Sequence, residues 1–311
     1  MNNAVRLKNN PAVIKKYFSS FFVWLFRWSF IIGICFTILY PLLTKLSMSF
    51  MQETDLYDST VKAIPKEFTL TNYMDVSIYT NFFQVLLNTV ILCTVVSVLQ
   101  TLSCTIAGYG FARFKFKGNG ILFVLVIILM VVPSQILLTP QYLNFKAFGM
   151  VGSFAPFVAL GITGVAPRCG LYIFLSRQFF RGVPKEVDEA AAIDGAGAFK
   201  TFTNIMIKSA VPIMVTIFLF SFVWQWGENS YTQLFNSNYE TIAQTLGNLG
   251  YDISADVNAS GVSFVSLANR MAYQSILQAT ITIMSIIPLL IVYVFSQKYF
   301  IQSIESTGIV G

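Results

Sequence analysis

Six stretches of this chain carry no Asp, Glu, Lys or Arg over 17 to 37 consecutive residues. They are residues 28–44, 76–112, 118–145, 147–167, 209–227 and 271–297. A helix needs about 20 predominantly apolar residues to cross the hydrocarbon core of a bilayer. A helix also satisfies its own backbone hydrogen bonds, which lipid cannot do. The pattern therefore predicts an all-α membrane protein with six transmembrane helices.

These stretches also set the expected domain boundaries. A transmembrane domain over 21–300 is flanked by an N-terminal segment, 1–20, and a C-terminal tail, 301–311. The six spans are expected at about 22–45, 82–112, 119–143, 154–177, 209–228 and 272–297. Residues 178–208 form a long loop between the fourth and fifth spans.

The orientation follows from the distribution of Lys and Arg, which favour the cytoplasmic side of a membrane. If the N-terminus is inside, the inner segments carry 13 of these residues and the outer segments carry 4. The sequence therefore predicts that both termini are cytoplasmic. This asymmetry also accounts for the net charge of +6 without a nucleic-acid partner.

Composition excludes several kinds of catalytic site. Only 11% of the residues are charged and none is His, which removes imidazole chemistry and most zinc and haem sites. The four Cys lie apart with no CxxC pair, so no metal site is expected. No Walker A motif occurs, so the chain is not expected to hold ATP in a P-loop. We expect a protein without enzymatic activity and without a cofactor.

The loop at 178–208 is the most informative segment. Pro184 suits the start of a helix, and acidic residues follow it near the positive helix N-terminus. Asp194-Gly195 is expected to end that helix, because Gly tolerates the left-handed cap conformation. A second helix is expected to start near Ala198. The alanine run at 190–192 offers a flat surface that another protein can approach closely, although an amphipathic connector lying on the membrane is the alternative.

Several motifs in the second half of the chain form a recognisable set. Residues 189–196 read EAAAIDGA, and an apolar stretch and Pro212 follow. Further matches are AGYGFARFKFKG at 107–118, Pro133-Ser-Gln135, and QKYFIQ at 297–302. Together they resemble the permease subunits of binding-protein-dependent ABC importers, in particular the smaller maltose-type subunit of the carbohydrate-uptake branch. The ends of the fifth span and of the tail depart from that pattern.

The resemblance implies a type I ABC importer permease fold in the cell membrane, with several partners. These are a second permease subunit in a heterodimer, two ATP-binding cassette ATPases that hydrolyse the ATP, and an extracellular solute-binding protein, with membrane lipid around the spans. It implies a translocation path for a sugar or oligosaccharide. The loop would dock on an ATPase through the residues Glu189, Ala190, Ala191, Asp194, Gly195 and Ala196. Glu189 would pair with a cation on the ATPase, and Asp194 would cap or hydrogen-bond the turn.

Polar and aromatic residues inside the spans are candidates for the substrate path, since rings can stack on sugars and amides can bond hydroxyls. They are Asn88, Gln135, Tyr142, Arg168, Trp224, Gln225 and Trp226. Contacts between helices are the alternative for each of them. Arg168 is too costly to leave in lipid, so it should face water, a partner or another helix.

Three other functions remain open at this point. The chain could be an ABC permease for another solute class. It could be a secondary transporter, although none of the six charge-free stretches contains the intramembrane carboxylate that such proteins usually carry. A membrane-embedded enzyme would need clustered catalytic groups, and the sequence offers none.

Overall fold

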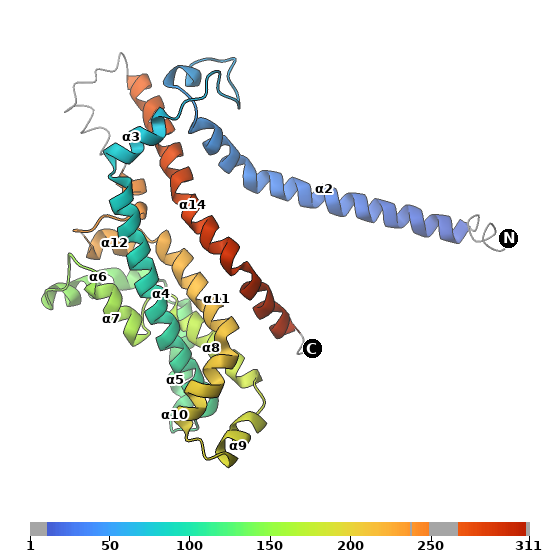
Figure 1. Ribbon diagram of the computed structural model, residues 1–311, viewed down its shortest axis with the longest axis vertical. Helices are drawn as coiled ribbons and strands as arrows, with labels where there is room; N and C mark the ends of the chain where they lie inside the picture. The colour runs from blue at the N-terminus through green and yellow to red at the C-terminus, as the bar shows by residue number, and fades with distance from the viewer. Residues whose placement is uncertain (1–10, 237, 249–266, 309–311) are drawn as a thin grey trace. The chain divides into compact units, whose positions relative to one another are not determined.

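The computed structural model describes the backbone of residues 11–236, 238–248 and 267–308, and the side chains of 20–236, 238–248 and 271–298. In this part of the chain all regular structure is helical (Figure 1). The chain divides into two compact units, one drawn from residues 1–73 and 266–283 and the other from 74–265 and 284–311. Helices α3 (Thr71–Tyr79) and α14 (Leu267–Gly308) each contribute residues to both units.

The first unit contains α2 (Pro11–Met48) and the short helix η1 (Glu53–Leu56). The segment Ser20–Met48 of α2 is long and apolar enough to cross a membrane. Its large apolar side chains, such as Phe26 and Ile32, are exposed in the isolated chain. An apolar helix whose large side chains are mostly exposed within the chain suits an environment of lipid or of another subunit.

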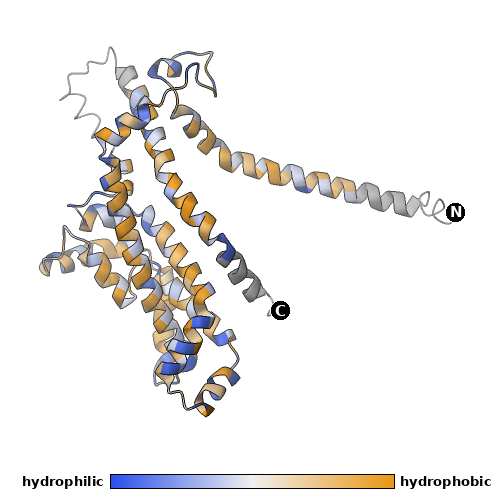
Figure 2. Ribbon diagram, viewed as in Figure 1, coloured by the Kyte–Doolittle hydropathy of each residue, from blue (hydrophilic) through white to orange (hydrophobic). Residues whose placement is uncertain are grey.

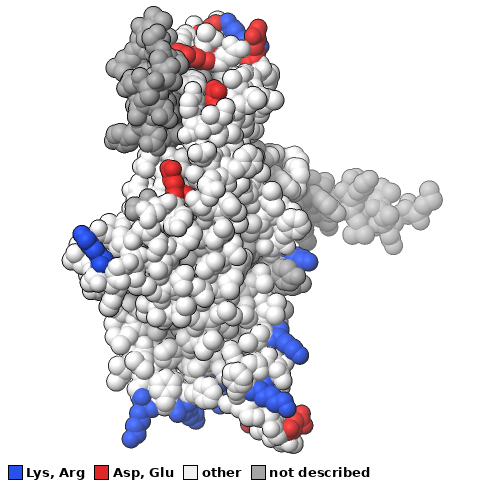
Figure 3. Space-filling view, turned by 60° about the vertical axis from the view of Figure 1, so that its left-hand side comes forward, with Lys and Arg blue, Asp and Glu red and all other residues white. Residues whose placement is uncertain are grey.

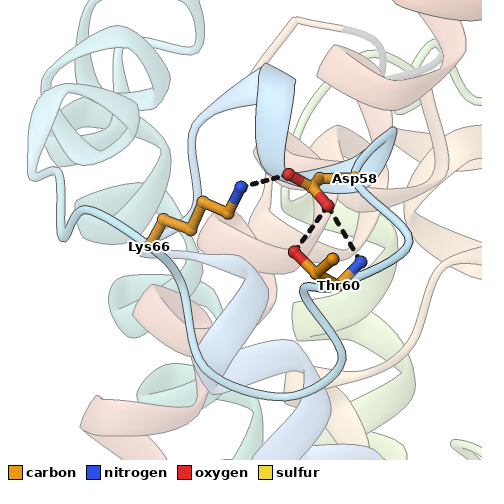
Figure 4. A network of polar contacts seen from close by, with 3 residues as sticks. All are labelled: Asp58, Thr60 and Lys66. Carbon is orange, nitrogen blue, oxygen red and sulfur yellow. Dashed lines mark hydrogen bonds and ion pairs between the residues drawn. The ribbon is translucent and has the colours of Figure 1, made fainter.

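The loop between α2 and α3 is held by polar contacts (Figure 4). Lys66 donates a hydrogen bond to the carboxylate of Asp58, and the Thr60 N–H and Oγ1 donate to Asp58 Oδ1 at 2.9 and 2.6 Å. The bond from Lys66 is the main cause that lowers the pKa of Asp58. Asn72 Nδ2 donates to the carbonyls of Ser49 and Met51 at 3.0 and 2.9 Å and so ties α3 to the end of α2.

The second unit is built around α4 (Phe82–Arg113), which packs against α7 (Ala155–Thr163), α8 (Cys169–Gly182) and α11 (Ile207–Trp226). Its core is apolar and includes the fully buried side chains of Tyr172, Phe180 and Ile217. Helix α5 (Asn119–Val131) packs against α8, and α6 (Ser134–Ala147) touches α12 (Ser230–Phe235). Figure 2 shows that α4 and α11 are apolar along most of their length.

Helices α4 and α8 approach closely where Gly108 faces Ser176. A Cβ atom added to Gly108 would lie 2.5 Å from Ser176 Cβ and 2.8 Å from the backbone N of Arg177. Ser176 Oγ also donates to the Thr105 carbonyl at 3.4 Å. Small residues at such a crossing allow two membrane helices to pack backbone to backbone.

The six expected spans correspond only in part to continuous helices. Among the described residues, four helical segments are long and apolar enough to cross a membrane: Ser20–Met48, Phe82–Arg113, Ala198–Trp226 and Met271–Lys298. The expected span at 119–143 is instead two helices, α5 and α6, which meet at a bend of 103°. Val132 is extended before Pro133, since proline disfavours helix for the residue that precedes it.

The expected span at 154–177 is also interrupted. Helix α7 ends before Gly164, whose φ is +68°, and α8 begins after Arg168, whose φ is +69°. Both residues lie in the left-handed region, so an α-helix cannot continue through them. The span expected at 154–177 therefore contains two helices, α7 and α8.

The first and last helices, α2 and α14, extend into the segments expected to be the termini. Helix α2 begins at Pro11, inside the expected N-terminal segment 1–20, and α14 runs to Gly308, inside the expected tail 301–311. Residues 1–10 and 309–311 lie outside the described residues. In the second unit, Lys and Arg side chains gather at the end where α9 (Glu186–Ile193) lies, as Figure 3 shows beside Figure 1.

Candidate functional site

Helices α9 and α10 (Ala198–Thr201) occupy the loop expected at 178–208, and α9 ends in a Schellman motif. The Ala196 N–H donates to the Ala191 carbonyl at 2.9 Å, and the Gly195 N–H donates to the Ala192 carbonyl at 3.1 Å. Gly195 has a φ of +72°. This pair of bonds satisfies the last carbonyls of α9 and requires a left-handed residue, for which Gly is best suited.

Backbone atoms make this cap, whereas the carboxylate of Asp194 does not. Asp194 occupies the C-cap position and is exposed. Within the described residues its side chain makes no hydrogen bond. The expected capping role therefore belongs to the backbone at this position, and the Asp194 side chain is left facing outward.

The start of α9 is fastened to the end of α4 by one arginine. Arg113 Nη2 donates to the Val183 carbonyl at 2.8 Å, and Arg113 Nε lies 3.2 Å from Asp188 Oδ2. The side chain of Arg113 is only 10% exposed. A mostly buried guanidinium with a carbonyl and a carboxylate as partners fixes both the chain before α9 and its first turn.

The outer surface of this loop carries two large apolar side chains. Ile193 is 87% exposed and Phe199 is 80% exposed, on either side of Gly195. The expected flat alanine surface is incomplete, because Ala191 is buried while Ala190 and Ala192 are exposed. Glu189 is exposed and forms no ion pair within the described residues.

A π-helical turn, η2 (Phe202–Met206), joins α10 to α11. The ring of Phe202 lies 4.7 Å from the ring of Tyr109 on α4, measured between centroids. Met206 is fully buried. A single π-turn within a helix is uncommon and is frequent at functional sites. Here it joins the exposed loop to α11, which packs against α4.

The two interrupted helices meet at one cavity. A cavity of about 390 Å³ is lined by residues from the α5–α6 bend, from the 164–168 break and from α11. Its polar and aromatic lining consists of Ser134, Gln135, Gln141, Arg168, Trp224 and Tyr231. Non-helical backbone at membrane depth is tolerated where it is covered by protein or lines a water-filled space, and discontinuous helices form the substrate sites of many transporters.

Arg168 holds a defined position in this cavity. It is the residue before α8, and its guanidinium lies over the Trp224 ring, 3.9 Å from the centroid. A non-glycine residue with positive φ costs on the order of 1–3 kcal/mol and persists only where its surroundings hold it. The cation–π contact with Trp224 is such a surrounding.

A smaller pocket of about 20 Å³ adjoins the cavity and shares Arg168 and Trp224 with it. Gln225 and Glu228 line this pocket too. Ser221 Oγ donates to Gln100 Oε1 at 2.6 Å, which joins α11 to α4 in its wall.

Three of the expected path residues do not line these two pockets and make contacts elsewhere. Asn88 Nδ2 donates to the Glu240 carbonyl at 3.0 Å. The Tyr142 ring stacks on Phe235 at 6.5 Å, and the buried Trp226 ring lies 5.7 Å from Phe222. The structure thus brings Gln135, Arg168, Trp224 and Gln225 together around the two adjoining pockets.

Sequence reasoning missed several residues of these sites. Gln100, Gln141, Ser221 and Tyr231 line the pockets. Gln100, Gln141 and Ser221 lie in charge-free stretches, and their polarity was the available signal. Arg113 belongs to the motif at 107–118 and to the cytoplasmic charges, but no local pattern in the sequence links it to Asp188.

The chain is similar in sequence to membrane subunits of known transport systems. Residues 104–306 match the family model described as "Binding-protein-dependent transport system inner membrane component". A putative ABC transporter permease protein of Caldicellulosiruptor sp. is 27% identical over 96% of this chain and 99% of its own length. The arabinooligosaccharides transport system permease protein AraQ of Halalkalibacterium halodurans is 27% identical over 91% of this chain and 96% of its own.

A solved structure has the same fold. It is a chain from the crystal structure of a bacterial ABC transporter involved in the import of the acidic polysaccharide alginate. The TM-score is 0.75 at 21% sequence identity, over 90% of this chain and 98% of the other.

Proposed function

Because the chain belongs to the family of inner membrane components of binding-protein-dependent transport systems, we propose that it is the permease subunit through which an ATP-driven importer passes a sugar or oligosaccharide. It is a multi-pass cell-membrane protein. Relatives named as permeases for arabinooligosaccharides, maltodextrin and melibiose, raffinose and stachyose support a carbohydrate substrate. The observation that carries the proposal is the cavity at which two interrupted helices meet.

We assign coupling to the loop that contains α9. Its exposed Ile193 and Phe199 would bury apolar surface in a cleft of an ATPase subunit, and Glu189 would face a cation there. The contacts of Arg113 with Val183 and Asp188 support this assignment, because they join the loop to α4. ATP hydrolysis belongs to two separate ATPase subunits, and an extracellular binding protein delivers the sugar.

The exposed apolar surface of α2 supports a second permease subunit as a partner, in a heterodimer surrounded by lipid. The six-span arrangement counts the α5–α6 pair as one span and the α7–α8 pair as another. Both termini then lie in the cytoplasm, on the same side as the loop that contains α9.

Deleting this chain from its host should abolish uptake of one class of sugar. The measurement is uptake of radiolabelled mono-, di- and oligosaccharides by the deletion strain, the parent and the complemented strain. Restored uptake on complementation is the control. Loss of amino-acid or metal-ion uptake with every sugar unaffected would contradict the proposal.

The orientation can be tested with single cysteines. In a variant with the native Cys35 changed to Ser, a cysteine at the exposed Thr60 should react with an impermeant maleimide in intact cells. A cysteine at Gly118 or Lys200 should react only after the membrane is opened. The opposite labelling would place the loop that contains α9 outside the cell. Ser260, an equivalent outer position by sequence, lies outside the described residues.

A further inference from the structure

The charge balance of the 390 Å³ cavity identifies a class of ligand. Arg168 is the one charged residue among the described residues that line it. The rest of the lining is apolar or neutral, with the amides of Gln135 and Gln141. A half-buried cation in a mostly apolar lining attracts an anion, since no counter-charge lies beside it there.

The guanidinium of Arg168 has no acidic partner within the chain as described. No carboxylate of the described residues lies within 4.0 Å of it. Glu228 lines the adjoining small pocket, but its Oε1 accepts a hydrogen bond from the Tyr231 N–H at 3.1 Å. The face of the guanidinium lies on Trp224. Its N–H donors around the edge are left to bond a planar or tetrahedral anion, which is the geometry that arginine recognises best.

Two further features suit an acidic sugar. Arg168 immediately precedes α8, a helix of 14 residues whose first turn adds positive potential at the same place. Gln141 also lies in the cavity wall. Its buried Oε1 has no hydrogen-bond partner among the described residues, so a rotation of the amide toward the cavity would let it accept from a hydroxyl. The cavity volume falls in the range of about 300–1,000 Å³ that is usual for small-molecule sites.

We propose that this cavity passes an anionic sugar, whose carboxylate or phosphate group pairs with Arg168 while Gln141 accepts from a hydroxyl. This inference rests on the proposed function of the chain as a sugar permease. It names the chemical class of the cargo.

The experiment measures uptake by cells that express the whole transporter, with trigalacturonate, glucose 6-phosphate, maltotriose and glucose as labelled probes. We expect uptake of an acidic probe in the wild type.

Arg168→Gln should lower that uptake at least tenfold at an unchanged membrane level, since it removes a charged hydrogen bond. Arg168→Lys should keep a substantial part of the uptake. Neither Gln nor Lys is β-branched, so at this positive φ the two variants differ mainly in charge. Lys117→Gln, which removes an exposed cation between α4 and α5, is the control and should leave uptake unchanged.

The outcomes separate the two proposals. Uptake of neutral probes alone would overturn the anionic cargo and leave the permease function intact. An equal loss of acidic and neutral uptake in Arg168→Gln would also overturn it, because Arg168 would then only support Trp224. If deletion of the chain left the uptake of every sugar unchanged, the permease function itself would be refuted.

A binding measurement covers the case in which Arg168→Gln does not reach the membrane. Purified transporter in nanodiscs is titrated with the same probes while tryptophan fluorescence is followed. Saturable quenching by trigalacturonate or glucose 6-phosphate, lost in Trp224→Phe and absent with maltotriose and glucose, supports the proposal. Equal responses to acidic and neutral probes, or none, would overturn it.

Discussion

Replacing Gly195 with Val should abolish sugar uptake while leaving the protein in the membrane. Gly195 holds the end of α9 at a φ of +72°, where a β-branched residue costs on the order of 1–3 kcal/mol. Its Cβ would meet nothing within 4 Å in this chain, so the strain is local and the core is undisturbed. We expect uptake to fall at least tenfold and the membrane level to change less than twofold. Quantitative blots and sugar uptake in the complemented deletion strain measure both.

Gly197→Val is the matched control for this prediction. Gly197 also has open space around it, but its φ of −69° suits any residue. Its replacement should retain most of the uptake, and Gly195→Asn should be mild because Asn tolerates the left-handed conformation. Equal losses at 195 and 197 would assign the effect to bulk at the docking surface and contradict the conformational argument. Normal uptake by Gly195→Val would mean that this loop does not couple ATP hydrolysis to transport.

Replacing Gly108 with Ala should destabilise the folded protein. In an ordinary helix this change is favourable by about 0.5–1 kcal/mol. Here the added methyl would lie 2.5 Å from Ser176 Cβ and 2.8 Å from a backbone nitrogen, so α4 and α8 must separate. Overpacking of this kind typically costs about 1–3 kcal/mol. We expect a lower midpoint of thermal unfolding in detergent and a reduced membrane level.

Gly110→Ala supplies the comparison on the same helix. A Cβ at Gly110 meets nothing within 4 Å, so this variant should be as stable as the wild type or slightly more stable. If Gly108→Ala and Gly110→Ala unfold at the same temperature, the close crossing of α4 and α8 is not a determinant of stability.

The sequence predicts helices well where length and hydropathy decide. The span expected at 82–112 is α4, which ends one residue later at Arg113. The end of α9 at Asp194 was predictable from the Asp-Gly pair. These features depend on local chemistry, which the sequence shows directly.

The sequence does not predict the two helix interruptions in the same way. It also does not predict which residues line the cavity. Pro133 and Gly164 are visible in the sequence, but prolines and glycines also occur inside continuous membrane helices. Pro212 lies within α11 without ending it. A helix that is apolar all round has no polar face to show which side is buried. Hence Trp224 and Trp226, two residues apart, were equivalent candidates, although one lines the cavity and the other packs on Phe222.

The contacts of Arg113 attach the loop that contains α9 to the end of α4, so a movement of that loop would be transmitted along α4. Arg113, which holds the loop, is 13 residues from Gln100, which lines the small pocket and accepts from Ser221. At 1.5 Å per residue, the two points are about 20 Å apart along one uninterrupted helix. A helix strains little over this length. If the loop docks on an ATPase as proposed, a displacement of the loop would also displace the wall of the pocket. Release of the sugar and the nucleotide-driven movement of the loop would then occur together, because α4 is continuous between the two points.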